Sequence, residues 1–322
     1  MTTVQLPSCA VLILNWNGAK WLQQCLPSVV EAAARVSADI VVVDNNSSDE
    51  SHLVCRGFQN VAFENVGANY VLVAYDIIAR RLRHDVIVLL NNDLCVDPAF
   101  LEPLLHDLRS DDGIFSVSPQ IRSFPPAPDA RVEKCSERVA WRRGMLRGAV
   151  RQSTAATATF FSSGAAMACW RRKFVELGGF DPLFLPGYYE DTDLGWRAWK
   201  RGWRCAYEPT SVVYHADGST MGRSRTVHRL IARNEFLFHW KNLQDKRLLL
   251  YHVLSLGPRL LSAMCRRRFI VVEGFISAIR RAPRCIVSRR QALASARVSD
   301  ADAIIRINGS SLQESAAAIT RS

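Results

Sequence analysis

The sequence predicts an α/β fold built on a mostly parallel sheet, and two patterns carry this prediction. Continuous apolar runs at residues 10–14, 40–43 and 86–90 are separated by segments in which apolar residues recur at helical spacing. Strands that are apolar throughout and alternate with helices are typical of a parallel sheet covered on both faces. The 322 residues, 48% of them apolar, suffice for one large α/β domain with an appendage.

The remaining elements follow from the same patterns. In chain order they are a helix up to about residue 34, a short strand at 61–63, a helix over 69–82, a buried strand at 161–170, and helices at 171–177 and 190–201. Glycines end the last two helices, at Gly178-Gly179 and at Gly202. Residues 138–153 are basic and irregular, so we expect an exposed segment there, either a mobile substrate loop or a plain surface excursion.

Charge and cysteine usage narrow the class of protein. A net charge of +11 indicates an anionic partner, which can be nucleic acid, a phosphorylated ligand or an anionic membrane. The basic residues lack interleaved aromatic side chains for stacking bases, so no nucleic acid is expected as a partner. Nine cysteines without a C-x-x-C pair indicate reduced thiols in a cytoplasmic protein. The N-terminal segment lacks the features of a signal peptide.

The C-terminal part of the chain is expected to be a basic helical extension over residues 243–292. Residues 259–290 hold nine arginines and one acid, and the intervening apolar segment 269–279 has an amphipathic helical pattern. That segment is too short to cross a bilayer, but it fits the interface of an anionic membrane. The alternative is a helix that packs on the catalytic domain. Residues 293–322 are rich in Ala, Ser and Arg and are expected to be poorly ordered.

Short polar residues follow three of the predicted strands directly. Because ligands bind at the carboxyl ends of strands in open α/β sheets, these side chains are expected to converge on one binding site. They are Asn15 and Asn17 after the first strand, Asp44 and Asn45 after the second, and Asn91, Asn92 and Asp93 after the strand at 86–90. A second cluster, Glu190, Asp191 and Asp193, opens a helix after the apolar and aromatic stretch FLPGYY, which suggests a partly dry pocket.

With these features, the sequence resembles a family 2 glycosyltransferase of the GT-A fold, in the branch that includes bacterial rhamnosyltransferases. The resemblance covers about residues 8–242 and rests on an ordered series of segments. They are LILNWNG (12–18), VVVDNNSSD (41–49), ENVGAN (64–69), LLNND (89–93), SGAAMA (163–168), GGFD (178–181), YYEDTDL (188–194), VVYH (212–215) and ARNEFLFHWKN (232–242). The resemblance implies a catalytic domain over 1–242, with a nucleotide-binding part at about 8–120 and an acceptor part at about 155–242.

For the donor, the resemblance implies a nucleotide sugar, with a dTDP- or UDP-sugar expected. Asp44 would accept hydrogen bonds from the base, Asn15, Asn17 and Asn45 would line the nucleoside pocket, and Asn65 and Asn69 would close the base and ribose site. The family's glycine-rich run after N-x-G is shortened here, where Ala68 and Asn69 follow Gly67 directly.

For a divalent cation, Mg²⁺ or Mn²⁺, the resemblance implies Asp93 and His215 as ligands. Asn91-Asn92-Asp93 takes the place of the family's D-x-D motif, so Asn91 would bond ribose or a metal-bound water. Hard cations prefer carboxylate and phosphate oxygens, which leaves Asp93 as the main carboxylate ligand.

Catalysis is expected to depend on Asp191, which matches the family's base. The acceptor hydroxyl must lose its proton as it attacks the anomeric carbon, and one base with direct displacement implies inversion. Glu190 and Asp193 would shape the site, with Asp193 the better candidate if one of the acids only caps the helix. Arg171 would have a pyrophosphate or a structural role, and Arg233 would reach the diphosphate.

The expected acceptor is a glycan or lipid-linked hydroxyl at the cytosolic face of the inner membrane, with rhamnose from a dTDP donor as the first guess from the branch alone. Two other classes compete. A non-catalytic nucleotide-sugar-binding or scaffold protein could use the same fold. A sugar-phosphate nucleotidyltransferase would need a Gly- and Arg-rich loop after the first strand, which LNWNGAKW does not supply.

Overall fold

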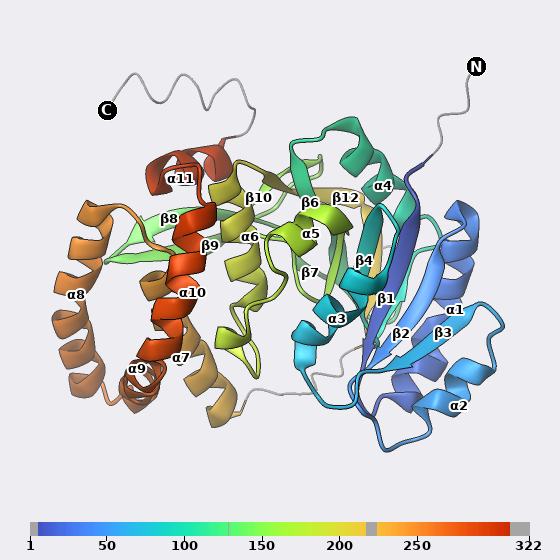
Figure 1. Ribbon diagram of the computed structural model, residues 1–322, viewed down its shortest axis with the longest axis horizontal. Coiled ribbons are helices and arrows are strands. Elements are labelled where there is room, and N and C mark those ends of the chain that lie inside the picture. The colour runs from blue at the N-terminus through green and yellow to red at the C-terminus, as the bar shows by residue number, and fades with distance from the viewer. Residues whose placement is uncertain (1–5, 128, 217–223, 310–322) are drawn as a thin grey trace.

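The computed structural model describes residues 6–127, 129–216 and 224–309, and it has the α/β architecture that the sequence predicts (Figure 1). The strands are β1 (Cys9–Asn15), β2 (Asp39–Asp44), β3 (Val61–Asn65), β4 (Val86–Asn91), β5 (Leu94–Val96), β6 (Ile114–Ser123), β7 (Val132–Lys134), β8 (Ser136–Arg142), β9 (Met145–Arg151), β10 (Thr157–Thr159), β11 (Ala166–Trp170) and β12 (Arg204–His215).

Helices separate most of these strands, and a further set follows β12. The α-helices are α1 (Ala19–Val36), α2 (Ser51–Arg56), α3 (Ala74–Arg81), α4 (Leu101–Ser110), α5 (Arg171–Glu176), α6 (Glu190–Arg201), α7 (Arg225–Asn242), α8 (Lys246–Cys265), α9 (Phe269–Arg280), α10 (Ala282–Ser295) and α11 (Asp300–Asn308). Two short 3₁₀ helices are η1 (Val71–Val73) and η2 (Pro182–Phe184).

The central sheet is parallel in its N-terminal half and mixed in its C-terminal half. Its strand order is β10-β12-β6-β11-β4-β1-β2-β3, and β1 pairs in parallel with both β2 and β4. The strand expected at 161–170 is shorter, because β11 starts at Ala166, and it runs antiparallel between β4 and β6. The carboxyl ends of β1, β2 and β4 therefore lie side by side, as the sequence analysis required.

Alternate side chains of the central strands enter two separate cores. On β1, Ala10 and Leu12 join the core that includes α3, α5 and α6, whereas Val11 and Ile13 join the core that includes α1 and α4. Because strand side chains alternate between faces, a strand covered on both sides must be apolar at every position. This explains the unbroken apolar runs of the sequence.

The basic segment 138–153 is not the exposed loop that the sequence suggested. It forms most of a hairpin of β8 and β9, and three of its apolar side chains, Val139, Met145 and Leu146, are buried in the core. The backbone amide of Leu146 donates to the ring of His239 on α7. The apolar residues of the segment, rather than its arginines, determine its position.

The C-terminal helices cover α7, which is buried along most of its length. Gly274 of α9 allows a close approach, since an added Cβ would lie only 2.6 Å from the Cβ of Ala232 on α7. By contrast, α8 buries only His252 and Ala263 among its residues. Figure 1 shows α8 at the outer edge of this helical layer.

The expectation that residues 293–322 are poorly ordered is wrong for part of that range, since α11 packs against the catalytic domain. Ala303 and Ile307 are fully buried, and the carboxylate of Asp300 forms a buried ion pair of 2.6 Å with Lys200 of α6. Asp300 also accepts hydrogen bonds from the amides of Gln244 and Asp245. The composition of residues 293–322 does not indicate that α11 packs, because three apolar side chains per two turns suffice to anchor a short helix. Residues 310–322 lie outside the described part.

Replacement of Asp300 by Ala tests whether α11 belongs to the folded body. The change leaves the buried ammonium of Lys200 without its partner, so we expect the free energy of unfolding to fall by about 3–5 kcal/mol in urea titrations. The control is Glu102→Ala, which removes the partly exposed pair with Arg35 and should cost at most about 1 kcal/mol. Equal effects of the two variants would show that α11 is not docked as described.

Candidate active site

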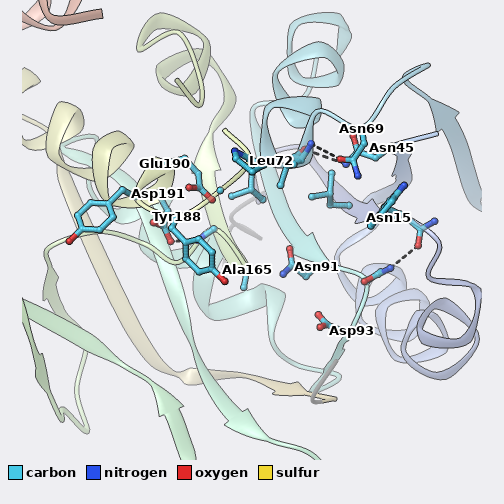
Figure 2. A pocket seen from close by; sticks show the side chains of 18 of the residues that line it. Asn15, Asn45, Asn69, Leu72, Asn91, Asp93, Ala165, Tyr188, Glu190 and Asp191 are labelled. Atoms are coloured by element: carbon cyan, nitrogen blue, oxygen red, sulfur yellow. Dashed lines mark hydrogen bonds between the residues drawn. The ribbon is translucent and has the colours of Figure 1, made fainter. Parts of the chain in front are cut away.

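A cavity of about 660 Å³ lies at the carboxyl ends of the parallel strands, between the β1–β4 loops and the start of α6. Figure 2 shows amide side chains on one side of it and carboxylates on the other, with Asn91 and Asp93 between them. Both Asp93 and Asp191 face this one cavity. The sequence-predicted residues that line it are Asn15, Asn45, Asn69, Asn91, Asn92, Asp93, Glu190, Asp191 and His215.

Three other predicted residues support the amide-lined side of the cavity from behind. Asp44 is fully buried, and its carboxylate accepts hydrogen bonds from the side chain of Asn15, from the amide and hydroxyl of Ser47, and from the side chain of Asn65. The side-chain oxygen of Asn17 accepts a hydrogen bond from the amide of Ser48. In this structure Asp44, Asn17 and Asn65 therefore hold loops together rather than form the cavity wall.

The two predicted metal ligands meet at the base of the cavity. Nε2 of His215 lies 3.2 Å from Oδ2 of Asp93, and Nδ1 of His215 lies 3.2 Å from Oε2 of Glu133. These bonds to Asp93 and then Glu133 raise the pKa of His215. Within the described residues, Oδ1 of Asp93 is buried and has no hydrogen-bond partner.

This arrangement fits a hard divalent cation. A buried carboxylate oxygen without a partner is costly unless a ligand satisfies it. If Glu133 holds the Nδ1 proton of His215, Nε2 could offer its lone pair to an ion that Asp93 also binds. No group of three or more His, Cys, Asp or Glu side chains comes together for a metal in the described part of the chain. Oxygens from a ligand would have to complete the coordination of the ion.

The loop before Asp191 has a strained backbone that α7 stabilises. Tyr188 and Tyr189 have φ angles of +72° and +74°, which non-glycine residues rarely adopt. The side-chain amide of Asn234 donates to the carbonyls of Phe184, Gly187 and Tyr188. Strain of this kind costs about 1–3 kcal/mol per residue and persists only where the surroundings enforce it, as Asn234 does here.

Arg233 shares this supporting role and does not point to the cavity. It is buried, and its guanidinium donates to the carbonyls of Phe184 and Leu185 and to the side-chain oxygen of Asn234. Arg233 is not among the residues that line the cavity, so its contact with a diphosphate stays a prediction. Its neighbour on the same helix, Ile231, lines the cavity instead.

Asp193 and Arg171 are also structural. Asp193 is fully buried and bonded to Lys241, Arg197 and Asn242. Burial alone would raise the pKa of Asp193, but the charges of Lys241 and Arg197 hold it below its usual range. Neither a donor contact nor a cap role applies to it. Arg171 donates to the carbonyl of His84, at the edge of the sheet opposite the cavity, because it follows the far end of β11.

Glu190 and Asp191 have different environments although they are adjacent. Asp191 accepts hydrogen bonds from the amides of Gly164 and Thr192, at 3.1 and 2.7 Å. Burial, and then the Asp191 charge, raise the pKa of Glu190 to about 8, so Glu190 carries a proton at neutral pH. The same two causes raise the pKa of nearby Glu137 to about 7. Because Glu190 already carries a proton, Asp191 is left as the candidate proton acceptor of the adjacent pair.

Glu235 connects this loop to the outer helix. Its carboxylate pairs with Arg259 of α8 at 2.8 Å and with Arg147 of β9. Burial, and then the Glu235 charge, raise the pKa of Tyr189. The ring of Tyr189 lies 5.7 Å from that of Phe238, on the same helix as Glu235.

Three cavity features escaped the sequence reasoning. Trp16 lines the cavity with an exposed indole, and Lys134 brings an ammonium group that donates to Ser163. Glu133 sits behind His215. Trp16 lies between Asn15 and Asn17, two residues predicted for the site, and this position in the sequence could have indicated its role. Lys134 and Glu133 come from β7, in a region without a regular pattern, and only the pairing of β7 with β6 brings them to the site.

Replacement of Glu190 by Gln tests the buried carboxyl group. Because its pKa is about 8 in the folded protein against 4.5 normally, ionisation opposes folding, and the wild type loses stability from this group as pH rises from 4.5 to 8. Gln cannot ionise. The stability of the variant relative to wild type should therefore increase over this pH range, by roughly 1–3 kcal/mol in urea titrations.

The control for this change is Glu64→Gln at an exposed glutamate of β3, for which the difference should stay flat with pH. A pH-independent difference for Glu190→Gln would contradict the raised pKa.

Comparisons with known proteins agree with the geometry. The family model described as "Glycosyltransferase like family 2" matches residues 7–233. The N-acetylglucosaminyl-diphospho-decaprenol L-rhamnosyltransferase of Mycobacterium tuberculosis, from strains CDC 1551 and H37Rv, is 25% identical over 247 residues, which are 68% of this chain and 79% of that protein.

Two solved structures share the fold. GalNAc-T7 with UDP, GalNAc and Mn²⁺ gives a TM-score of 0.60 at 19% identity. The match covers 74% of this chain and 49% of the GalNAc-T7 chain. The mannosyltransferase PcManGT from Pyrobaculum calidifontis, in complex with GDP-Man and Mn²⁺, gives 0.53 at 16% identity, over 99% of this chain and 79% of that one. With the family model matching most of its length, the chain belongs to glycosyltransferase family 2.

Proposed function

We propose that this glycosyltransferase moves a sugar from a nucleotide diphosphate to an acceptor hydroxyl with inversion, using a divalent cation and Asp191 as base. The observation that carries the proposal is that Asp93 and Asp191 face one and the same cavity. A sugar nucleotide bound there would have its diphosphate near the first and its anomeric carbon near the second.

The nucleoside would occupy the side of the cavity lined by Asn15, Asn45 and Asn69. Amide side chains can both donate to and accept from a base or a ribose. The exposed indole of Trp16 offers a flat apolar surface beside them. Asp44 would act indirectly here, by fixing the orientation of Asn15.

The diphosphate would lie between Asp93 and Lys134. Asp93 and His215 are the residues that would hold Mg²⁺ or Mn²⁺, and the bound ion would stabilise negative charge on the leaving diphosphate. Lys134 adds a fixed positive charge at the cavity wall. The relatives solved with Mn²⁺ and a nucleotide or nucleotide sugar support this choice of ligands.

The proton of the acceptor hydroxyl would pass to Asp191. The amides of Gly164 and Thr192 fix the position of its carboxylate, and the buried Asn234 contacts fix the loop that precedes it. Glu190, which carries a proton at neutral pH, can donate a hydrogen bond to a sugar hydroxyl. Such a division of roles between two adjacent carboxyl groups would follow from the raised pKa of Glu190.

For the acceptor, we propose a lipid-linked glycan at the cytosolic face of the inner membrane. The mycobacterial relative supports this, because its name gives a diphospho-decaprenol acceptor and a rhamnosyl product. Rhamnose from a dTDP-sugar is accordingly the first donor to test.

Replacement of Asp191 by Asn tests the base. We expect transfer to fall by about 10²–10⁴-fold, because the amide cannot accept the proton. Donor binding, measured by calorimetry with Mn²⁺, should stay close to that of wild type. Glu64→Gln is the matched control and should leave both unchanged. Transfer by Asp191→Asn at a rate near wild type would refute the assignment, and failure of wild type to bind any donor would favour a scaffold role.

Replacement of Glu133 by Ala tests the support of the metal site without measuring transfer. The loss of the Glu133–His215 bond should lower the affinity for Mn²⁺ by about 10–100-fold, as measured by electron paramagnetic resonance in the presence of a nucleoside diphosphate. Glu133→Gln, which keeps an acceptor oxygen, should recover part of the affinity. If Glu133→Ala binds Mn²⁺ as wild type does, Glu133 does not orient His215.

A further inference from the structure

The outer face of α8 is an apolar surface that nothing in the described structure covers. Leu250, Leu254 and Leu261 lie at spacings of four and seven residues, which places them on one side of the helix, and Val253 and Met264 extend it. Leu254 and Leu261 are 65% and 63% exposed. We call these five residues the α8 face. An exposed apolar stripe of this length marks an interaction surface.

The inner side of α8 is fixed by specific polar contacts. Nδ1 of His252 bonds the carbonyl of Gly144 at 2.7 Å, and its ring stacks on that of His239 at 5.3 Å. Arg259 pairs with Glu235. By length and composition alone α8 could also cross a membrane. Crossing would carry His252 and Arg259 away from these partners and into hydrocarbon, which is expensive, whereas lying in the interface preserves the contacts.

Positive charge borders the α8 face at both ends. Lys246 and Arg247 begin the helix, and Arg266, Arg267 and Arg268 follow its last turn, all of them exposed. Residues 246–292 contain eleven basic residues and one acid. A second copy docked antiparallel on this face would bring the basic ends of the two helices together. An anionic lipid surface instead complements them, since arginines reach the headgroups while leucines enter the acyl boundary.

The sequence suggested a membrane contact for the apolar segment of α9. Only part of that segment is exposed. Gly274 and Ala278 bury one side of α9 against α7, and Phe269, Ile276 and Ile279 remain exposed. α7 also reaches the active site, because Ile231 lines the cavity and its neighbour Ala232 contacts Gly274. The basic helical layer thus packs directly on a helix that also lines the cavity.

We propose that the α8 face, with its flanking basic residues, is the surface by which this protein docks on an anionic bilayer, α8 lying in the headgroup region. The proposal extends the lipid-linked acceptor of the proposed function, because docking would bring the cavity to an acceptor anchored in the same bilayer. Vesicle binding requires neither donor nor metal nor acceptor, so its outcome is independent of the catalytic assignments.

The test is cosedimentation of the full chain with vesicles of phosphatidylcholine, with and without phosphatidylglycerol. Wild type should bind the anionic vesicles at least about tenfold more strongly, and high salt should weaken the binding. The double change Leu254→Glu and Leu261→Glu should reduce binding by about tenfold or more. The matched control is Leu53→Glu, an exposed leucine of α2, which should bind as wild type does. Arg266→Gln with Arg268→Gln should weaken binding to anionic vesicles alone.

Urea titrations show whether each variant is folded. If the double leucine variant is not folded, the double arginine variant still tests the proposal. Four results would overturn the proposal. The first two are no binding of wild type to anionic vesicles and equal binding to neutral vesicles. The third is resistance of the bound protein to carbonate extraction, which would indicate a spanning helix. The fourth is a wild-type dimer that the leucine changes dissociate.

Discussion

The buried carboxylate of Asp44 holds the nucleotide side of this site together. Its two oxygens accept hydrogen bonds from Asn15 at the end of β1, from Ser47 in the loop after β2, and from Asn65 at the end of β3. Asn15 in turn accepts a hydrogen bond of 2.7 Å from Asn92, the residue before Asp93. One carboxylate at a strand end therefore positions both the amide wall and the loop that carries Asp93. Hydrogen bonds to a charged group contribute about 1.5–3 kcal/mol each, which is enough to order loops of this length.

The opposite side of the site depends on α7 in a similar way. Asn234 and Arg233 bond the carbonyls of the loop that precedes Asp191, and Lys241 and Asn242 bond the buried Asp193 one turn into α6. Each half of the cavity is thus held by residues that do not line it. Groups fixed before a ligand arrives need no reorganisation during a reaction, which is how polar sites stabilise developing charge.

The sequence predicted the strands and the polar residues at their ends because both follow from local rules. A strand buried on both faces must be apolar, and short polar residues at its carboxyl end mark a ligand site. The sequence did not distinguish the residues that line the cavity from the residues that support them. Asn15 and Asp44 look alike in sequence, yet one lines the cavity and the other lies behind it. Asp193 and Arg233 were assigned to the site through resemblance, and their buried pairs depend on contacts between helices distant in sequence.

Other features depend on tertiary pairing that no local pattern reveals. Glu133 and Lys134 reach the site only because β7 joins the sheet edge at β6. Residues 138–153 are rich in arginine, and their few buried apolar side chains decide their place in the core. The apolar segment 269–279 has the more regular amphipathic pattern, whereas α8, with less regular sequence periodicity, has the larger uncovered surface.

The ion pair between Arg259 and Glu235 has a mechanical consequence. α8 touches the active-site loop through a linkage only two side chains long, because Glu235 lies beside Tyr189, two residues before Asp191. A force that pulled α8 outward by a few ångströms would separate the pair and alter the charge next to a tyrosine that is already in a strained backbone conformation. A load on the outermost helix would then reach the loop that precedes Asp191, without any motion of the sheet.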